Sequence, residues 1–129
     1  MPKLSELVNV DINRSTIRIQ GVEIPVIFTF KSFPYVEEAF GKSYGTFEQE
    51  MNRMMSQGKI TLGKKEIKLM HSLIYAMIKS GGTDCTVNEI ENAIPLTDLP
   101  AIFQVAIDLF NDQNFQKTDM DKLKTEKKN

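Results

Sequence analysis

Residues 16–30, TIRIQGVEIPVIFTF, hold two runs of alternating polar and apolar residues, one on each side of the pair Gln20-Gly21. Alternation with a period of two is typical of a strand with one buried face, and glycine tolerates the positive φ of a two-residue turn. The stretch therefore predicts a β-hairpin. Pairing across the turn, with Ile19 opposite Val22, places these apolar side chains on one face: Ile17, Ile19, Val22, Ile24, Val26, Phe28 and Phe30.

This hairpin needs a partner, because an isolated two-stranded ribbon is only marginally stable in water. We expect its apolar face to pack on helices, on a neighbouring subunit, or on both. Pro25 has no backbone N–H to donate, so its strand is expected at an edge of the sheet.

From Ser32 onward, the apolar residues recur at helical spacing, and capping signals divide this part of the chain into about five helices. The first expected helix begins at Ser32 and ends at Gly41, and the second opens at the capping box Thr46-Phe47-Glu48-Gln49 and ends at Gln57-Gly58. The third runs over Glu66 to Lys79. The fourth opens at Thr86-Val87-Asn88-Glu89 and ends before Pro95, and the fifth runs from Thr97 or Asp98 through Phe110. The helix over Glu66 to Lys79 is apolar around most of its circumference, which predicts a central position.

A cluster of flexible side chains lies on the second of these helices, where Met51, Met54 and Met55 share a face with Phe47. Adaptable filling of the core is the first interpretation of this face. A surface that fits several partners is the second, because thioether side chains serve both uses.

The predicted fold is α+β and mainly α, with an N-terminal β-hairpin followed by a compact bundle of about five helices. A chain of 129 residues is long enough to bury a core without disulfides or a structural metal. Residues 1–14 are expected to form an irregular arm or a short strand, and residues 15–116 a single domain. Residues 117–129 are rich in lysine and poor in large apolar residues, and they predict a disordered charged tail.

The charges are balanced, with 16 Lys and Arg against 17 Asp and Glu, whereas a dedicated nucleic-acid binder is usually basic. Their distribution is uneven, since residues 80–116 contain six acids and neither Lys nor Arg. Such an asymmetry favours head-to-tail self-association or a charged partner, and two solvated faces of one domain explain it as well. No run is apolar enough for a secretion signal or a membrane span, so we expect a cytoplasmic protein without membrane contact.

The two residues best suited to chemistry occur once each, His71 on the expected central helix and Cys85 in the following loop. They cannot form a Cys/His zinc site or an internal disulfide. A Cys-His nucleophilic pair is formally possible, but no local feature marks Cys85 as an activated thiolate. A hydrogen-bonded core or boundary histidine is the ordinary interpretation of His71. We therefore expect no catalytic, metal-binding or cofactor-binding residues.

The order of the expected elements resembles the tail assembly chaperones of long-tailed bacteriophages and their prophages. The resemblance rests on the hairpin over Thr16 to Ile24 and on the segment Phe33 to Gly45. It extends to a central helix, a glycine-containing break, a Thr-capped short helix and a closing acidic helix, so it covers about residues 16–116. It carries no functional residue over to this chain.

The resemblance implies an assembly factor that is not an enzyme and is absent from the finished virion. Such a protein binds the tape measure protein, keeps it soluble, and promotes polymerisation of the tail tube protein around it. Copies of the chaperone are expected to associate with one another, and the partner-binding residues are unknown.

Three alternatives remain open. A small helical adaptor would share every bulk property of the sequence. A DNA-binding regulator would use the last two helices as a helix-turn-helix, but the second of these carries Asp98, Asp108 and Asp112 and no basic residue that could contact phosphates. An enzyme based on Cys85 and His71 is the least supported hypothesis.

Overall fold

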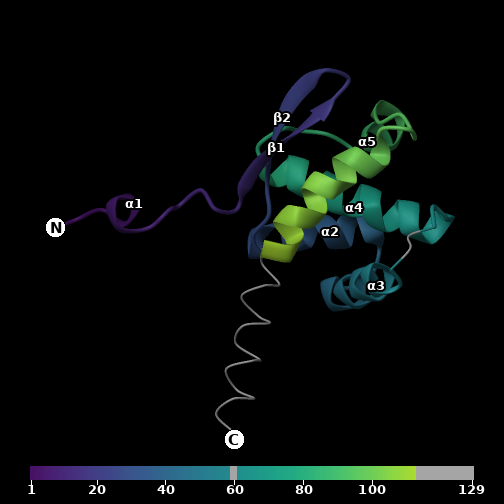
Figure 1. Ribbon diagram of the computed structural model, residues 1–129, viewed down its shortest axis with the longest axis horizontal. Helices are drawn as coiled ribbons and strands as arrows, with labels where there is room; N and C mark the ends of the chain where they lie inside the picture. Colours follow the sequence, from purple (N-terminus) through teal and green to yellow (C-terminus); the bar gives the residue numbers. More distant parts are fainter. Residues whose placement is uncertain (59–60, 113–129) are drawn as a thin grey trace, which may run out of the picture.

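The computed structural model describes residues 1–58 and 61–112, and the predicted tail over residues 117–129 lies outside them. The elements follow in the order α1 (Leu4–Leu7), β1 (Arg14–Ile19), β2 (Val22–Ile27), the 3-10 helix η1 (Phe30–Ser32), α2 (Phe33–Phe40), α3 (Tyr44–Ser56), α4 (Lys64–Ser80) and α5 (Val87–Ala93). A last helix covers residues 99–112 and is called the C-terminal helix below. The fold is α+β and mainly α, with an N-terminal hairpin followed by helices, as predicted (Figure 1).

The hairpin has the predicted register, with Ile17 opposite Ile24 and Ile19 opposite Val22. Gln20 and Gly21 form the two-residue turn, and both have positive φ, as a turn that matches the strand twist requires. Ile17 and Ile19 are buried, so this face of the hairpin belongs to the core.

Two residues predicted on the buried face lie at the surface instead, because Val22 is 60% and Phe30 is 73% exposed. Val22 directly follows the turn at the tip of the hairpin. Phe30 lies beyond the end of β2 at Ile27, so it is outside the strand whose alternation would have turned it inward. The chain instead enters η1.

The end of β2 is stabilised by a local exchange of hydrogen bonds. Thr29 Oγ1 accepts from the Lys31 N–H at 3.2 Å, and Ser32 Oγ accepts from the Thr29 N–H at 3.1 Å. Helix α2 therefore begins directly after Ser32, as predicted, although the Ser32 hydroxyl does not cap it. Gly41, with φ of 83°, ends α2 in the left-handed conformation that glycine favours.

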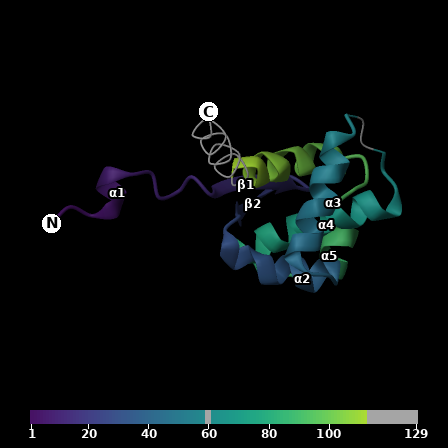
Figure 2. The same ribbon diagram turned by 90° about the horizontal axis from the view of Figure 1, so that it is seen from below.

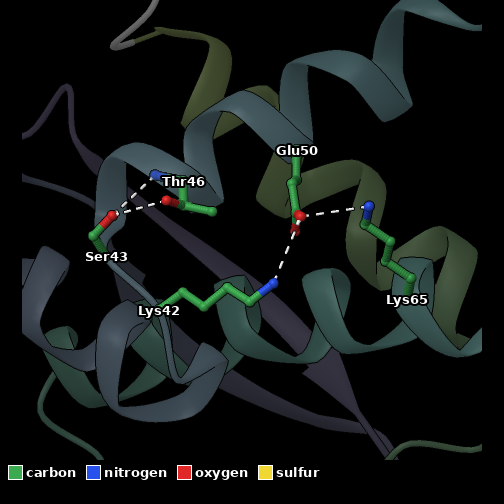
Figure 3. Close-up of polar contacts among 5 residues, drawn as sticks. All are labelled: Lys42, Ser43, Thr46, Glu50 and Lys65. Atoms are coloured by element: carbon green, nitrogen blue, oxygen red, sulfur yellow. Dashed lines mark hydrogen bonds and ion pairs between the residues drawn. The ribbon is translucent and has the colours of Figure 1, made fainter.

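The prediction that Thr46 opens the next helix is wrong, because α3 begins at Tyr44 and its N-cap is Ser43. Figure 3 shows Ser43 Oγ accepting from the Thr46 N–H at 3.2 Å and lying 3.0 Å from the Thr46 hydroxyl. Thr46 thus lies within the first turn of the helix, where the sequence suggested a cap.

Helix α4 occupies the centre of the fold, as its apolar circumference predicts. It contacts β2, η1, α2, α3 and α5. It begins at Lys64, two residues before the expected start, since the Glu66 carboxylate reaches back to accept from the Gly63 N–H at 3.0 Å. The Thr86 capping box opens α5 as predicted.

Helix α4 lies between the hairpin and α2, and the C-terminal helix crosses on the hairpin side (Figure 2). Phe28 of the hairpin segment contacts Phe110 of the C-terminal helix, with ring centroids 5.7 Å apart. The buried apolar residues form one cluster that draws on the hairpin, on α2, α3, α4 and α5, and on the C-terminal helix. None of the described helices is long and apolar enough to cross a membrane.

The first twelve residues lie outside this core. They are exposed throughout and project away from the body of the molecule, as both views show (Figures 1 and 2). We call residues 1–12 the arm. It contains the short helix α1, whereas its sequence suggests an irregular segment or a strand.

Candidate partner-binding surfaces

The structure does not bring His71 and Cys85 together as a nucleophilic pair. His71 lies in the first half of α4, about 14 Å along the helix axis from Ser80, and Cys85 follows in the loop beyond. Electrostatic contacts on the Cys85 thiol come from Lys79, Glu89 and Asp84. Among the described residues, no group of three or more His, Cys, Asp or Glu is arranged to hold a metal ion.

The thiol of Cys85 is also poorly suited to act as a nucleophile. Burial raises its pKa above the ordinary value, and the positive charge of Lys79 only partly opposes this effect. The thiol therefore stays protonated at neutral pH, whereas the reactive form is the thiolate.

His71 lines a groove of about 470 Å³ between α2, α4 and α5, which we call the α2–α4–α5 groove. Its residues are Ala39 from α2; Lys64, Ile67, Lys68, His71 and Ser72 from α4; and Val87 and Glu91 from α5. The side chains of Ala39, Ile67 and Val87 are half-buried and give the groove an apolar surface. Grooves of this kind, apolar with a few polar groups, are common binding sites for ligands and for partner helices.

The charges around the α2–α4–α5 groove differ between its two sides. Lys64 and Lys68 stand on the α4 side, and Glu91 stands on the α5 side. Partial burial of His71 lowers its pKa below the ordinary value of 6.5, while the nearby Glu91 carboxylate opposes this shift. The imidazole is therefore neutral at pH 7, and the α4 side carries the positive charge of the two lysines.

A further group of charges continues from the groove toward α3. Figure 3 shows the Glu50 carboxylate between two lysines, 3.4 Å from Lys65 Nζ and 4.0 Å from Lys42 Nζ. The Glu50 side chain is only 14% exposed, so it links α3 to α4 and to the loop before α3. Lys68 lies beside this group, over the ring of Phe40.

Acidic side chains lie on the surface formed by residues 80–112. All six acids of residues 80–112 are exposed: Asp84, Glu89, Glu91, Asp98, Asp108 and Asp112. They lie on α5, on the C-terminal helix and in the adjoining loops. The asymmetry along the sequence thus becomes an acidic surface on the second half of the fold.

The methionine face of α3 is part of the core. Phe47 and Met51 are fully buried, and Met54 is nearly so, while Met55 is partly exposed. The core interpretation of this face is therefore confirmed, and its side chains offer little surface to a partner.

The arm is the largest concentration of exposed apolar side chains. Of the ten large apolar side chains that the described residues expose, six belong to the arm: Met1, Leu4, Leu7, Val8, Val10 and Ile12. Sequence analysis missed this feature. Residues 1–14 contain apolar residues without a sustained period, so the sequence does not show which of them are exposed. Only the position of the arm beyond the core makes these side chains accessible.

Comparison of the chain with protein-family models, with curated proteins and with solved structures found no match.

Proposed function

We propose that the protein is a tail assembly chaperone of a long-tailed bacteriophage or prophage. In this role it binds the tape measure protein in the cytoplasm of the bacterial host and keeps it soluble. It promotes polymerisation of the tail tube protein around the tape measure protein and leaves before the virion is complete. It acts by binding, without catalysis.

The order of elements supports the proposal. The hairpin is followed by the central helix α4, a break at Gly81-Gly82, the Thr86-capped helix α5 and an acidic closing helix. These are the elements on which the resemblance rests, and they follow in the same sequence.

The observation that best supports the proposal is that a well-packed core is combined with many exposed apolar side chains. Among the described residues, no buried side-chain nitrogen or oxygen lacks a hydrogen-bond partner. Apolar side chains nevertheless remain exposed on the arm and at Phe30. Exposed apolar groups of this kind mark interaction sites, and a long, partly apolar helical chain such as a tape measure protein needs such a surface to stay soluble.

A DNA-binding regulator is less well supported. The helix that would enter the major groove is the C-terminal helix, and its exposed residues include Asp108 and Asp112. Carboxylates at these positions would repel the phosphate backbone.

Co-expression with a candidate tape measure protein tests the proposal. We expect a soluble complex with several copies of this chain per tape measure chain, measured by size-exclusion chromatography with light scattering. Substitution Phe30→Ser is expected to reduce the amount of soluble tape measure protein, because it removes an exposed aromatic side chain that the core does not use. The neighbouring substitution Lys31→Ser is the matched control.

A tape measure protein that precipitates while this chain elutes alone would contradict the proposal. A small helical adaptor with another partner would then be the better hypothesis. Equal effects of Phe30→Ser and Lys31→Ser would exclude Phe30 from the contact.

A further inference from the structure

We propose that the α2–α4–α5 groove and the lysines beside it bind an acidic amphipathic helix of a partner protein. The inference goes beyond the proposed function, because it concerns a separate contact that uses neither Phe30 nor the arm. It can be tested on the purified chain with defined peptides, so its outcome is independent of the co-expression experiment.

The groove supplies the apolar part of this surface. Ala39, Ile67 and Val87 come from three different helices, and each is half-buried, so each keeps part of its side chain open to a ligand. The volume of about 470 Å³ is in the usual range for a ligand pocket. A helix that inserts apolar residues at a spacing of three and four into such a groove is a common form of peptide recognition.

Lysines supply the charged part of the surface. A second hollow of about 330 Å³ lies beside the groove, and Lys64 and Lys68 line both. Lys42 and Lys65 also line the second hollow, and all four lysines are exposed. We call these four residues the lysine cluster. The groove and the hollow thus form one continuous surface, apolar in one part and basic in the other.

The positive charge of the lysine cluster is only partly neutralised within the protein. Among the described residues that line the second hollow, Glu50 alone is acidic, and it pairs with Lys65 and Lys42 (Figure 3). Lys64 and Lys68 form no ion pair with any residue that the structure describes. Carboxylates of a partner would therefore meet ammonium groups that the fold does not use.

The α5 side of the groove has the opposite charge, because Glu91 lies there. His71 adds no positive charge to the groove, since partial burial lowers its pKa and leaves the imidazole neutral at pH 7. A bound helix therefore turns an acidic flank toward the lysine cluster, and its flank beside Glu91 is neutral or basic. The two flanks of a helix lie on either side of its apolar face, so one helix fits both sides of the groove.

Other occupants fit this surface less well. The phosphates of a nucleic acid would contact the lysine cluster, but they would leave the apolar part of the groove unused and would be repelled by Glu91. The acidic C-terminal helix of a second copy is also unsuitable, because its apolar face is buried in its own core. The surface therefore favours a helix from a different protein.

The first test uses a labelled synthetic peptide of about 15 residues, long enough to form a helix. It carries leucine on one face at a spacing of three and four and glutamate along one flank. One control peptide has lysine in place of each glutamate, and another has the same composition in scrambled order. Fluorescence anisotropy should show that the acidic peptide binds at least about tenfold more tightly than either control. Absence of this preference would overturn the proposal.

A single-stranded DNA oligonucleotide tests the other class of occupant. We expect it to bind more weakly than the acidic peptide and not to displace it. An oligonucleotide that binds more tightly and displaces the peptide would show that the lysine cluster serves a nucleic acid, and this result would overturn the proposal.

The substitution Lys68→Glu tests the lysine cluster, and Lys3→Glu is its control. Both variants have the same net charge, but Lys3 lies in the arm, outside the groove. Lys68→Glu is expected to weaken binding of the acidic peptide about tenfold or more, because it places a carboxylate against the acidic flank. Lys3→Glu should bind like the wild type, and equal binding by the two variants would contradict a contact at the lysine cluster.

The substitution Val87→Asp tests the apolar part of the groove, and Asn88→Asp is its control. Both add a carboxylate to the first turn of α5, where it is favourable to the helix, so both variants are expected to fold. Only Val87 lines the groove. Val87→Asp should reduce binding about tenfold and Asn88→Asp much less. Equal affinities, with both variants folded by circular dichroism, would refute docking in the groove.

The ring signals of His71 report on the groove directly, because the chain has a single histidine and this residue lines the groove. In proton NMR spectra, they should shift when the acidic peptide is added and stay in place when the lysine peptide is added. Binding of the acidic peptide without a shift of these signals would place the contact elsewhere and overturn the proposal.

Discussion

At the scale of single residues, Gly81 shows how closely the hairpin approaches the end of α4. Gly81 has an ordinary helical φ of −74°, so its backbone conformation does not require glycine. A Cβ atom at this position, however, would overlap the carbonyl oxygen of Pro25 and lie 3.1 Å from Val26 Cα. The absent side chain therefore allows β2 to pack directly on the C-terminus of α4.

We expect Gly81→Ala to lower the free energy of unfolding by about 1–3 kcal/mol, because the new methyl group meets backbone atoms that cannot rotate away. Urea unfolding followed by circular dichroism measures this loss. Gly45→Ala is the control, since nothing lies within 4 Å of a Cβ at Gly45 and the residue lies in α3. This variant should be as stable as the wild type or up to about 1 kcal/mol more stable.

The free energy of unfolding depends on pH through His71, and the sign of this dependence follows from the partial burial of the imidazole. Because the pKa of His71 is lowered in the folded state, the unfolded chain takes up a proton first as the pH falls through 6.5. The stability that depends on neutral His71 is therefore present above pH 6.5 and lost as the pH falls through the pKa of the folded state. NMR titration should give a midpoint below 6.5, and His71→Gln should remove this part of the pH dependence. A midpoint at or above 6.5 would contradict the expectation.

At the scale of elements, the start of α3 depends on one hydroxyl group. Ser43→Ala removes the acceptor for the Thr46 N–H and is expected to cost about 1 kcal/mol of unfolding free energy. Thr46→Ala keeps that acceptor and is expected to cost less. Thermal unfolding of the two variants measures the difference, and a larger loss in Thr46→Ala would indicate that the helix begins at Thr46.

Features with two agreeing local signals were predicted correctly, whereas features with competing local signals were not. The hairpin register was predicted correctly, because the turn at Gln20-Gly21 and the alternation of side chains both act between near neighbours. The start of α3 was misplaced, since Ser43 and Thr46 are both good capping residues and the sequence does not show which of them accepts the hydrogen bond. Phe30 was misplaced for a similar reason, because the exchange between Thr29 and Ser32 ends the strand before the alternation ends.

The binding surfaces were less predictable than the elements. The α2–α4–α5 groove combines residues that are far apart in the sequence, such as Ala39 and Glu91. Periodicity identifies the buried face of each helix, but it does not show where three helices leave a gap. His71 was interpreted as a core or a boundary residue, and the structure shows it half-buried at the boundary. Its place in the groove depends on α2 and α5, to which it does not belong.

At the scale of the whole molecule, one core joins the hairpin to the helices. Phe28 contacts Phe33 of α2 and Phe110 of the C-terminal helix, with ring centroids 6.0 Å and 5.7 Å apart. We expect a single cooperative unfolding transition, because neither part can lose its packing without exposing the other. Far-UV circular dichroism, which follows the helices, and the NMR methyl signals of Ile17, which follow the hairpin, should therefore give the same midpoint. Two separate midpoints would show that the hairpin and the helices unfold independently.

The arm projects from the body of the molecule and lies outside the core, whose first buried apolar residue is Ile17. Proteases cut exposed, weakly packed segments in preference to packed ones. Brief digestion at a low protease concentration should therefore remove residues from the arm and leave the hairpin and the described helices as one resistant fragment.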